Sequence, residues 1–167
     1  MRVLNDIKSN IHSLPLTPSQ IACRDRIEER LAYPGVVNLY GLPGVGKTVL
    51  GWAMAADARA RYLVHLSRLK GRPFSDDEDP VVFIDNASAE RTAFRRLLGA
   101  LESAEVERAI AVTRRPADDY VFRAELCLMA EDVEIARRNL ASLGHTVSGD
   151  DWGNLWHGLL RAARERR

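Results

Sequence analysis

The chain has 167 residues, of which 46% are hydrophobic and 28% are charged, and its formal net charge is +1. This length and composition are typical of one globular domain with a proper core, and the near-neutral charge gives no overall case for nucleic-acid binding. No apolar run approaches the length of a membrane span, no signal-peptide pattern is present, and Cys23 and Cys127 lack the spacing of a metal site, so we expect a cytoplasmic protein with reduced thiols.

Two helices are predicted ahead of the first strand. Apolar residues recur at helical spacing near the N-terminus, at Val3, Ile7, Ile11 and Leu14. This pattern predicts a short amphipathic helix over residues 2–13, which packs on the domain or on a partner. A second helix begins at Thr17, its predicted N-cap, with Pro18 in the first turn and Gln20 placed to complete a capping box. It is predicted to run to about residue 32.

The strongest signal is the glycine-rich stretch Gly41–Thr48, which follows the P-loop pattern G-x-x-x-x-G-K-T. A β-branched and aromatic run over 36–40 predicts a buried strand entering the loop, and a helix-forming run leaves it. The glycines let the backbone N–H groups face inward as an anion nest, Lys47 can reach the β- and γ-phosphates, and the Thr48 hydroxyl can bind Mg²⁺. This predicts a nucleoside triphosphate site formed by Gly41, Pro43, Gly44, Val45, Gly46, Lys47, Thr48 and Val49.

Strands and helices alternate through the rest of the chain. Four further strands are predicted, over residues 62–66, 81–85, 109–113 and 125–129. Helices are predicted over residues 49–60, 89–103 and 130–143. The mixed-charge segment 67–80 is expected to be an exposed loop. A last helix, capped by Ser148, has one apolar face that packs in the core or against a partner, formed by Trp152, Leu155, Trp156, Leu159 and Leu160.

The alternation predicts an α/β fold, in which a doubly wound, mainly parallel five-stranded sheet with the P-loop lies between two layers of helices. The ligand in such a fold lies at the carboxyl ends of the strands. Asp85 follows four apolar residues, as in a Walker B strand, whose carboxylate lies beside the P-loop and holds Mg²⁺ opposite Thr48, mostly through water. A later strand ends in Thr113 and is followed by Arg114.

Together these motifs resemble the P-loop ATPases of the AAA+/STAND (ASCE) superfamily, reduced to a minimal core, over about residues 17–144. The resemblance implies ATP and Mg²⁺ as ligands. It also implies that Thr113 and Arg114 sense the γ-phosphate, since Val112-Thr113-Arg114 is similar to the Thr-Thr-Arg motif of STAND ATPases. Arg123 lies near the place of an arginine finger. The chain would then be a single domain, made of an N-terminal amphipathic helix (1–16), the ATPase core (17–144) and a C-terminal helix (145–167).

Two departures from this family pattern affect the expected activity. Hydrolytic members commonly carry Glu or Asp directly after the Walker B carboxylate, to orient and deprotonate the attacking water. This chain has Asn86 there, which can orient water but cannot take its proton, and Glu90 is an alternative base. We therefore expect slow hydrolysis. The second departure is that the chain leaves little room for a full helical lid after the core, so no sensor 2 arginine can be assigned.

The leading hypothesis is an ATP-dependent switch, in which nucleotide state is read by a protein partner or a second copy. Lys47, Asp85, Asn86, Thr113 and Arg114 would supply charge stabilisation and water positioning rather than covalent chemistry. A small-molecule or nucleotide kinase is one alternative, suggested by the Arg and Asp residues between positions 114 and 123. A DNA-associated loader-type ATPase is another, suggested by basic residues over 59–72 and at the C-terminus. The family resemblance implies ATP rather than GTP, and no guanine-reading Asn-Lys-x-Asp segment is found in the sequence.

Overall fold

A parallel sheet forms the centre of the molecule. The computed structural model describes residues 2–57, 60–69, 81–145 and 152–164. Within them, five strands form one sheet in the order β2-β3-β4-β1-β5, and every neighbouring pair is parallel. The strands are β1 (Gly35–Tyr40), β2 (Ala60–Leu63), β3 (Val81–Ile84), β4 (Arg108–Thr113) and β5 (Phe122–Glu125). The predicted doubly wound parallel sheet is therefore confirmed.

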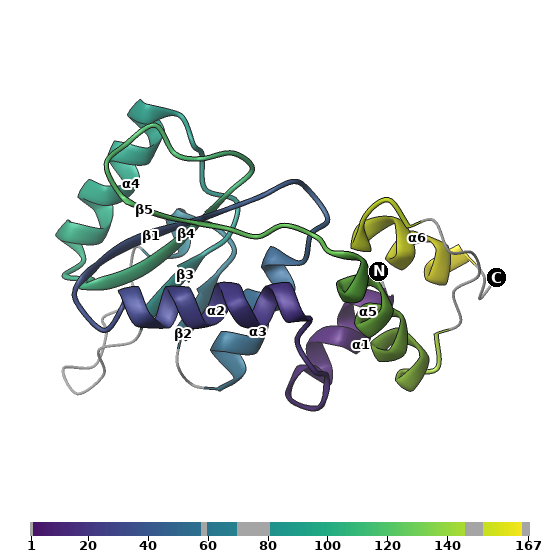
Figure 1. Ribbon diagram of the computed structural model, residues 1–167. Coiled ribbons are helices and arrows are strands. Elements are labelled where there is room, and N and C mark those ends of the chain that lie inside the picture. The colour runs from purple at the N-terminus through teal and green to yellow at the C-terminus, as the bar shows by residue number, and fades with distance from the viewer. Residues whose placement is uncertain (1, 58–59, 70–80, 146–151, 165–167) are drawn as a thin grey trace.

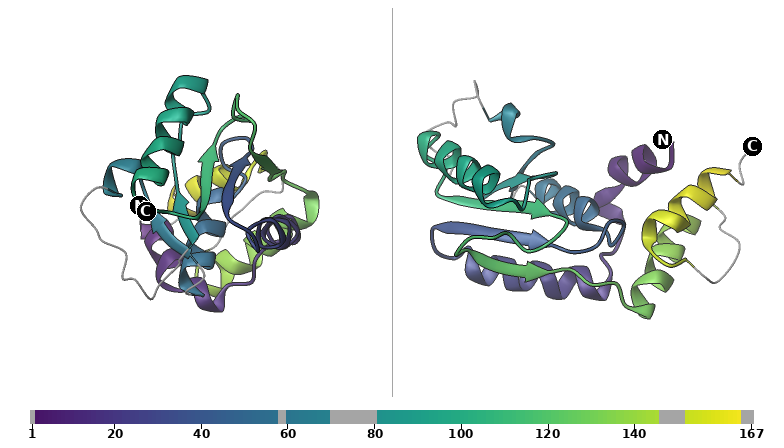
Figure 2. Two further views of the ribbon diagram at one scale, coloured as in Figure 1. Left: turned by 90° about the vertical axis from the view of Figure 1, so that its left-hand side faces the viewer. Right: turned by 90° about the horizontal axis from the view of Figure 1, so that it is seen from above.

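Helices cover both faces of this sheet (Figure 1). Helices α2 (Pro18–Arg30) and α3 (Lys47–Ala56) share one core cluster with the sheet, and α4 (Arg91–Ser103) shares the cluster on the other face. Figure 2 shows α2 and α4 on opposite sides of the strands. The molecule thus has the three layers, α/β/α, that the sequence predicts.

The sheet is buried on both faces because its central strands alternate side chains between two apolar clusters. In β3, Phe83 packs toward α2 and α3, whereas Val82 and Ile84 pack toward α4. In β4, Ile110 and Ala111 divide in the same way. These strands read as continuous apolar runs in the sequence, so their positions are predicted to within one residue.

A third group of helices lies at one end of the sheet (Figure 1). It consists of α1 (Arg2–Ser9), the 3₁₀ turn η1 (Ile11–Ser13), α5 (Ala130–Ser142) and α6 (Leu155–Arg164). Their buried side chains, together with Trp152 just before α6, form a third core cluster, composed of Val3, Ile7, Ile11, Leu140, Trp152, Leu155 and Ala162. The two ends of the chain are thus packed together. In the described part of the chain, no helix combines the length and apolarity needed to cross a bilayer.

The last strand is a correction to the prediction. β5 covers Phe122–Glu125, not residues 125–129. It is an edge strand that pairs only with β1 among the described strands, and Ala124 is its one buried residue. The apolar residues after it indicated a strand, but they lie in the extended connection to α5, where Leu126 fills the core and donates its N–H to the Tyr40 carbonyl (2.9 Å). An edge strand lacks the apolar run by which a central strand is recognised.

Other boundaries also differ from the prediction. β2 ends at Leu63 rather than at residue 66, so His65 lies outside the strand, next to the 3₁₀ turn η2 (Leu66–Arg68). The final helix begins at Leu155, and Trp152 precedes it in a turn. Ser148 and most of the predicted loop 67–80 lie outside the described residues.

The predicted helix start at Thr17 is confirmed. The Thr17 N–H donates to Gln20 Oε1 (2.9 Å), and the Gln20 N–H donates to Thr17 Oγ1 (3.4 Å), which completes the capping box. The helix starts where the side chains of Thr17 and Gln20 satisfy backbone groups that would otherwise lack partners. This cap fixes α2 beside the P-loop, because Gln20 Nε2 also donates to the Gly46 carbonyl (3.0 Å).

Candidate nucleotide-binding site

The P-loop joins β1 to α3 at the carboxyl edge of the sheet. Gly44 and Gly46 adopt positive φ angles of 85° and 97°, a region that L-residues with a Cβ rarely adopt. A Cβ on Gly46 would also lie 2.6 Å from the Gln20 side-chain nitrogen. α3 begins at Lys47, directly after the loop, so the free N–H groups of its first turn face the same space. The loop therefore has the local conformation that an anion nest requires.

A cavity of about 720 Å³ lies over this loop. Six of the eight residues predicted to bind the nucleotide line it: Pro43, Gly44, Gly46, Lys47, Thr48 and Val49. Gly41 and Val45 are not among its lining residues, and the Val45 side chain is buried in the core below the loop. The remaining walls come from the residues after β3, from the tip of β4 and from the helical end of the molecule.

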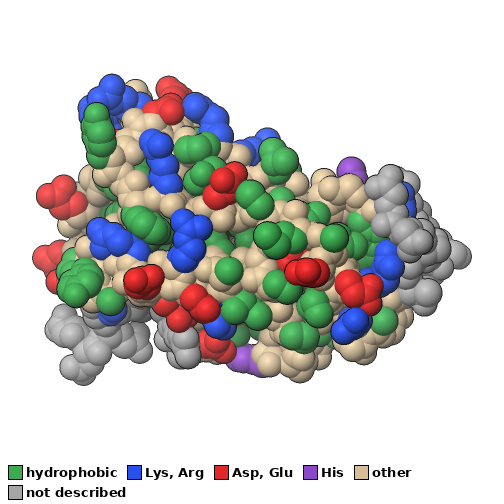
Figure 3. Space-filling model, in the orientation of Figure 1, with side chains coloured by type: hydrophobic (Ala, Val, Ile, Leu, Met, Phe, Trp, Pro, Cys, Tyr) green, Lys and Arg blue, Asp and Glu red, His purple; other side chains and the backbone are tan. Residues whose placement is uncertain are grey.

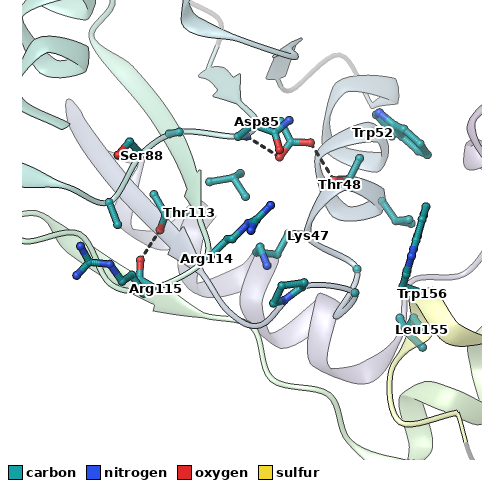
Figure 4. A pocket seen from close by; sticks show the side chains of 18 of the residues that line it. Lys47, Thr48, Trp52, Asp85, Ser88, Thr113, Arg114, Arg115, Leu155 and Trp156 are labelled. Carbon is teal, nitrogen blue, oxygen red and sulfur yellow. Dashed lines mark hydrogen bonds between the residues drawn. The ribbon is translucent and has the colours of Figure 1, made fainter. Parts of the chain in front are cut away.

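Lys47 lies against the loop that precedes it. Its Nζ donates to the carbonyls of Gly41 (2.6 Å) and Leu42 (2.8 Å). Burial lowers the pKa of Lys47; Asp85 opposes this effect and the positive charge of Arg114 adds to it. Figure 4 shows Arg114 directed from the tip of β4 toward Lys47. Two cationic side chains thus converge on the cavity, which favours an anionic ligand.

Asp85 lies directly after β3 and accepts three hydrogen bonds. Thr48 Oγ1 donates to Asp85 Oδ2 (2.9 Å), as does the Tyr62 hydroxyl (2.6 Å), and the Asn86 N–H donates to Asp85 Oδ1 (2.8 Å). Burial and the hydrogen bond to Asp85 raise the pKa of Tyr62, so its hydroxyl remains a donor at neutral pH. Thr48 thus contacts Asp85, which lies 37 positions further along the sequence (Figure 4).

The donor set around Asp85 fits Mg²⁺. This ion prefers oxygen ligands, keeps several of its waters, and needs only one or two protein carboxylates. Thr48 and Asp85 offer a hydroxyl and a carboxylate oxygen at the floor of the cavity. The described residues contain no group of three or more His, Cys, Asp or Glu side chains that could hold a metal by themselves.

At the tip of β4, the two predicted sensor residues differ in orientation. The Thr113 hydroxyl donates to the Arg115 carbonyl (2.6 Å) and accepts from Asn38 Nδ2 (2.8 Å), so it is held within the sheet and the following loop. Arg114 extends into the cavity (Figure 4). The sequence reasoning missed Asn38, which is fully buried in β1 and also accepts the Ala117 N–H (2.8 Å). The sequence does contain a signal for it, because Asn38 is a polar residue within the apolar run of β1.

Asn86 and Glu90 both line the cavity beyond Asp85. Asn86 has φ 55°, in the left-handed region that asparagine tolerates better than most residues. Glu90 is the N-cap residue of α4. The chain therefore turns sharply after Asp85 and brings both side chains to the cavity, while the position next to Asp85 offers an amide and no carboxylate.

Residues of the kinase and arginine-finger interpretations lie in the β4–β5 connection and, for Arg123, in β5 itself. Arg123 Nη2 donates to the Ala117 carbonyl (2.6 Å) and the Asp119 carbonyl (3.4 Å). Arg115 pairs with Asp118 (3.3 Å), and Figure 4 shows its side chain directed away from Arg114. In this conformation these groups stabilise the loop.

The far end of the cavity is apolar, and the sequence reasoning did not assign it. Its walls are Leu4 of α1, Trp52 of α3, and Leu155, Trp156 and Leu159 of α6. The N-terminus of α6 contacts the P-loop directly, because the Leu155 N–H donates to the Gly44 carbonyl (3.1 Å). The cavity therefore has a cationic and oxygen-rich end and an aromatic end.

Comparisons with known proteins agree on the fold. No protein-family model and no curated protein matches the sequence. Among solved structures, the chain is similar to replication initiator DnaA bound to AMPPCP and single-stranded DNA, with a TM-score of 0.55 and 12% identity over 93% of this chain and 64% of that one. It is also similar to the Thermotoga maritima RuvB Holliday junction branch migration motor, with a TM-score of 0.51 and 19% identity over 85% of this chain and 61% of that one.

Both proteins are AAA+ P-loop ATPases. The chain spans less than two thirds of either structure. At these identities the likeness establishes a shared fold, and the protein has the fold of the AAA+ P-loop ATPases. The structures named here are AAA+ proteins, and they give no evidence for the STAND part of the sequence resemblance.

Proposed function

We propose that the protein binds a Mg²⁺-nucleoside triphosphate, ATP by its family resemblance, and acts as a slow ATPase switch. One observation carries this proposal: the Thr48 hydroxyl lies 2.9 Å from the Asp85 carboxylate, at the floor of a cavity formed by a P-loop. Two motifs from separate parts of the chain thus supply one set of oxygen ligands beside Lys47. This contact between the two motifs supports the proposed site.

The phosphates would occupy the cationic end of the cavity. Backbone N–H groups of the loop and the first turn of α3 would donate to them, and Lys47 would exchange its bonds to the Gly41 and Leu42 carbonyls for phosphate oxygens. Arg114 would stabilise negative charge on the γ-phosphate. Thr48 and Asp85 would hold Mg²⁺, whose positive charge would offset that of the phosphates. The base would lie at the aromatic end, against Trp52 and Trp156.

Hydrolysis would be slow because Asn86 can orient water but cannot accept its proton. Glu90 lines the same cavity and is the carboxylate available to act as the base. Thr113 would act through its loop, since its hydroxyl is bound to the Arg115 carbonyl.

The contact between α6 and the P-loop supports a switch. The Leu155 N–H donates to the Gly44 carbonyl, and Trp156 lines the cavity. A ligand bound in the P-loop would therefore change the position of α6 relative to the loop. A protein partner or a second copy of the chain could then read the position of α6. The position of α6 against the P-loop would therefore differ between the nucleotide-bound and nucleotide-free protein.

The experiment that tests this proposal compares Lys47→Ala with the parent protein. We expect the parent to bind a fluorescent ATP analogue and to release phosphate slowly, and Lys47→Ala to lose both. Binding without turnover would leave a nucleotide-gated binding module. Equal binding by the two proteins would contradict the proposed site, and transfer of phosphate to a small-molecule acceptor would favour the kinase.

A second candidate function is DNA association. α4 exposes Arg91, Arg95 and Arg96 around a surface hollow, and Figure 3 shows Lys and Arg side chains gathered at this end of the molecule. One arginine, Arg95, also pairs with Asp119 (3.2 Å). The similar DnaA structure contains single-stranded DNA. Binding of single-stranded DNA that weakens steeply with salt and is lost in a double Arg91→Ala and Arg96→Ala variant would favour this candidate.

A further inference from the structure

Asp85 has a hydrogen-bond partner that no nucleotide-binding motif of the chain includes. Tyr62 lies on β2, the strand next to β3, and its hydroxyl donates to Asp85 Oδ2 at 2.6 Å. The same oxygen accepts the Thr48 hydroxyl. The bond to Tyr62 is the shorter of the two, and it approaches from the side of the sheet rather than from the P-loop.

The ring of Tyr62 is held between two other aromatic rings. It stacks on Phe83 with a centroid distance of 5.6 Å and an interplanar angle of 22°. Trp52 of α3 meets it edge to face, at 6.3 Å and 61°. Tyr62 is also in register with Phe83 in the parallel β2–β3 pair. Because the backbone and both ring neighbours fix the side chain, the hydroxyl is directed at Asp85 before any ligand binds.

The hydrogen bonds to Asp85 then determine which way its carboxylate faces. A carboxylate offers about four acceptor positions. Asn86 takes one on Oδ1, and Thr48 and Tyr62 take two on Oδ2. Asp85 is only 6% exposed, so an unfilled position directed into the protein would be costly. Tyr62 fills the position on the sheet side, which leaves the remaining one for the cavity.

We propose that Tyr62 is a positioning residue, which orients the Asp85 carboxylate so that it can hold Mg²⁺ or a Mg²⁺-bound water in the cavity. This inference rests on the proposed nucleotide site. Partners that hold a metal ligand typically change metal affinity 10- to 100-fold when they are removed. The bond from Tyr62 thus sets how strongly Mg²⁺ supports nucleotide binding, and it has little effect on the phosphate contacts of the P-loop.

The test removes the hydroxyl and retains the ring, in Tyr62→Phe. Affinity for a fluorescent ATP analogue is measured in EDTA and across a Mg²⁺ titration. We expect the affinity in EDTA to stay within about twofold of the parent, because the P-loop is unchanged. The Mg²⁺ concentration for half-maximal enhancement of binding should rise about 10-fold.

Tyr40→Phe is the matched control. It also removes a tyrosine–carboxylate hydrogen bond, from Tyr40 to Glu125 (3.2 Å), but this bond joins β1 and β5, and β4 lies between them and β3. We expect this variant to keep the Mg²⁺ midpoint of the parent. In an Asp85→Asn background, Tyr62→Phe should produce no further shift, because the two changes remove the same interaction.

The outcomes separate the inference from the proposed function. An unchanged Mg²⁺ midpoint in Tyr62→Phe, with Mg²⁺-dependent binding intact in the parent, would overturn only the role of Tyr62. An equal loss of affinity in EDTA and in Mg²⁺ would mean that Tyr62 merely supports the fold, and would also overturn it. A parent protein that binds no nucleotide would refute the proposed site together with this inference.

Discussion

At the scale of single residues, the site depends on side chains whose backbone conformation or burial constrains them. Asn86 is the clearest case, because its φ of 55° suits asparagine, aspartate and glycine better than larger residues. Its N–H also bonds to Asp85, so the turn and the carboxylate are coupled. The residue that limits the proposed hydrolysis is therefore also the residue that shapes the turn after β3.

Asn86→Asp tests whether the missing carboxylate limits hydrolysis, and it keeps the turn after β3. Aspartate tolerates the same left-handed conformation and adds a group that can accept a proton. A positioned general base typically contributes 10²- to 10⁴-fold. We expect phosphate release to rise at least about tenfold, with nucleotide affinity nearly unchanged. Asn86→Gly, which keeps the turn but removes the side chain, is the control and should show no gain. No gain in Asn86→Asp would assign the base to another residue, with Glu90 the next to change.

At the scale of elements, two helix N-termini share one carboxylate. Asp132 in the first turn of α5 is 1% exposed; it accepts the Met129 N–H (2.6 Å) and, from α2, the Ser19 N–H (2.9 Å). Burial alone would raise the pKa of Asp132, but the hydrogen bonds from Ser19 and Met129 prevail and lower it. The helical end of the molecule is thus fastened to the start of α2.

The lowered pKa predicts a pH-dependent stability. Because the folded-state pKa of Asp132 lies below its unfolded value of about 3.9, its contribution is fully present above that pH and is lost as the pH falls through the folded pKa. Asp132→Asn should lower the free energy of unfolding by roughly 1–3 kcal/mol at pH 7, and by less as the pH falls below about 4. Urea unfolding at several pH values measures this. For Glu134→Gln, at an exposed site on the same helix, the difference in free energy of unfolding from the parent should not shrink in this way as the pH falls. A difference for Asp132→Asn that stays the same at every pH would contradict the role given to the Asp132 carboxylate.

Element positions were predictable where burial makes a distinctive pattern. β1, β3 and β4 are buried on both faces and appear as apolar runs, and the Thr17 capping box is a local signal that needs no tertiary context. β5 was misplaced because an edge strand exposes most of its side chains. A strand is recognised in a sequence by apolar residues at its buried positions. A strand with a single buried residue, such as β5, therefore gives little signal.

At the scale of the whole molecule, the cavity is built by distant parts of the chain. Its aromatic end combines α1, α3 and α6, and Trp156 is 44% exposed there. The predicted apolar face of the last helix divides accordingly: Trp152 is buried in the core of the helical end, and Trp156 faces the cavity. The sequence predicted that this face packs either in the core or against a partner, and neither alternative describes both Trp152 and Trp156.

Trp156→Ala tests whether this end holds the base. Stacking of a base on an aromatic ring contributes roughly 1–3 kcal/mol, so we expect at least about a fivefold loss of ATP affinity, equal in EDTA and in Mg²⁺. Leu160→Ala removes a similarly exposed side chain one turn further along α6, outside the cavity lining, and should bind as the parent does. Binding measured by fluorescence of the analogue distinguishes the two. Equal affinity in both variants would place the base elsewhere.

The sequence by itself determined the doubly wound parallel fold, the P-loop and the order of motifs along the chain, because glycine conformations, helix caps and apolar runs are local properties. It also identified Asp85, since a carboxylate after four apolar residues is a recognisable pattern. Only the tertiary structure decided which side chains meet. The contacts of Tyr62 with Asp85 and of Leu155 with Gly44 join elements far apart in sequence, and no local pattern encodes such pairs because they depend on how the layers pack.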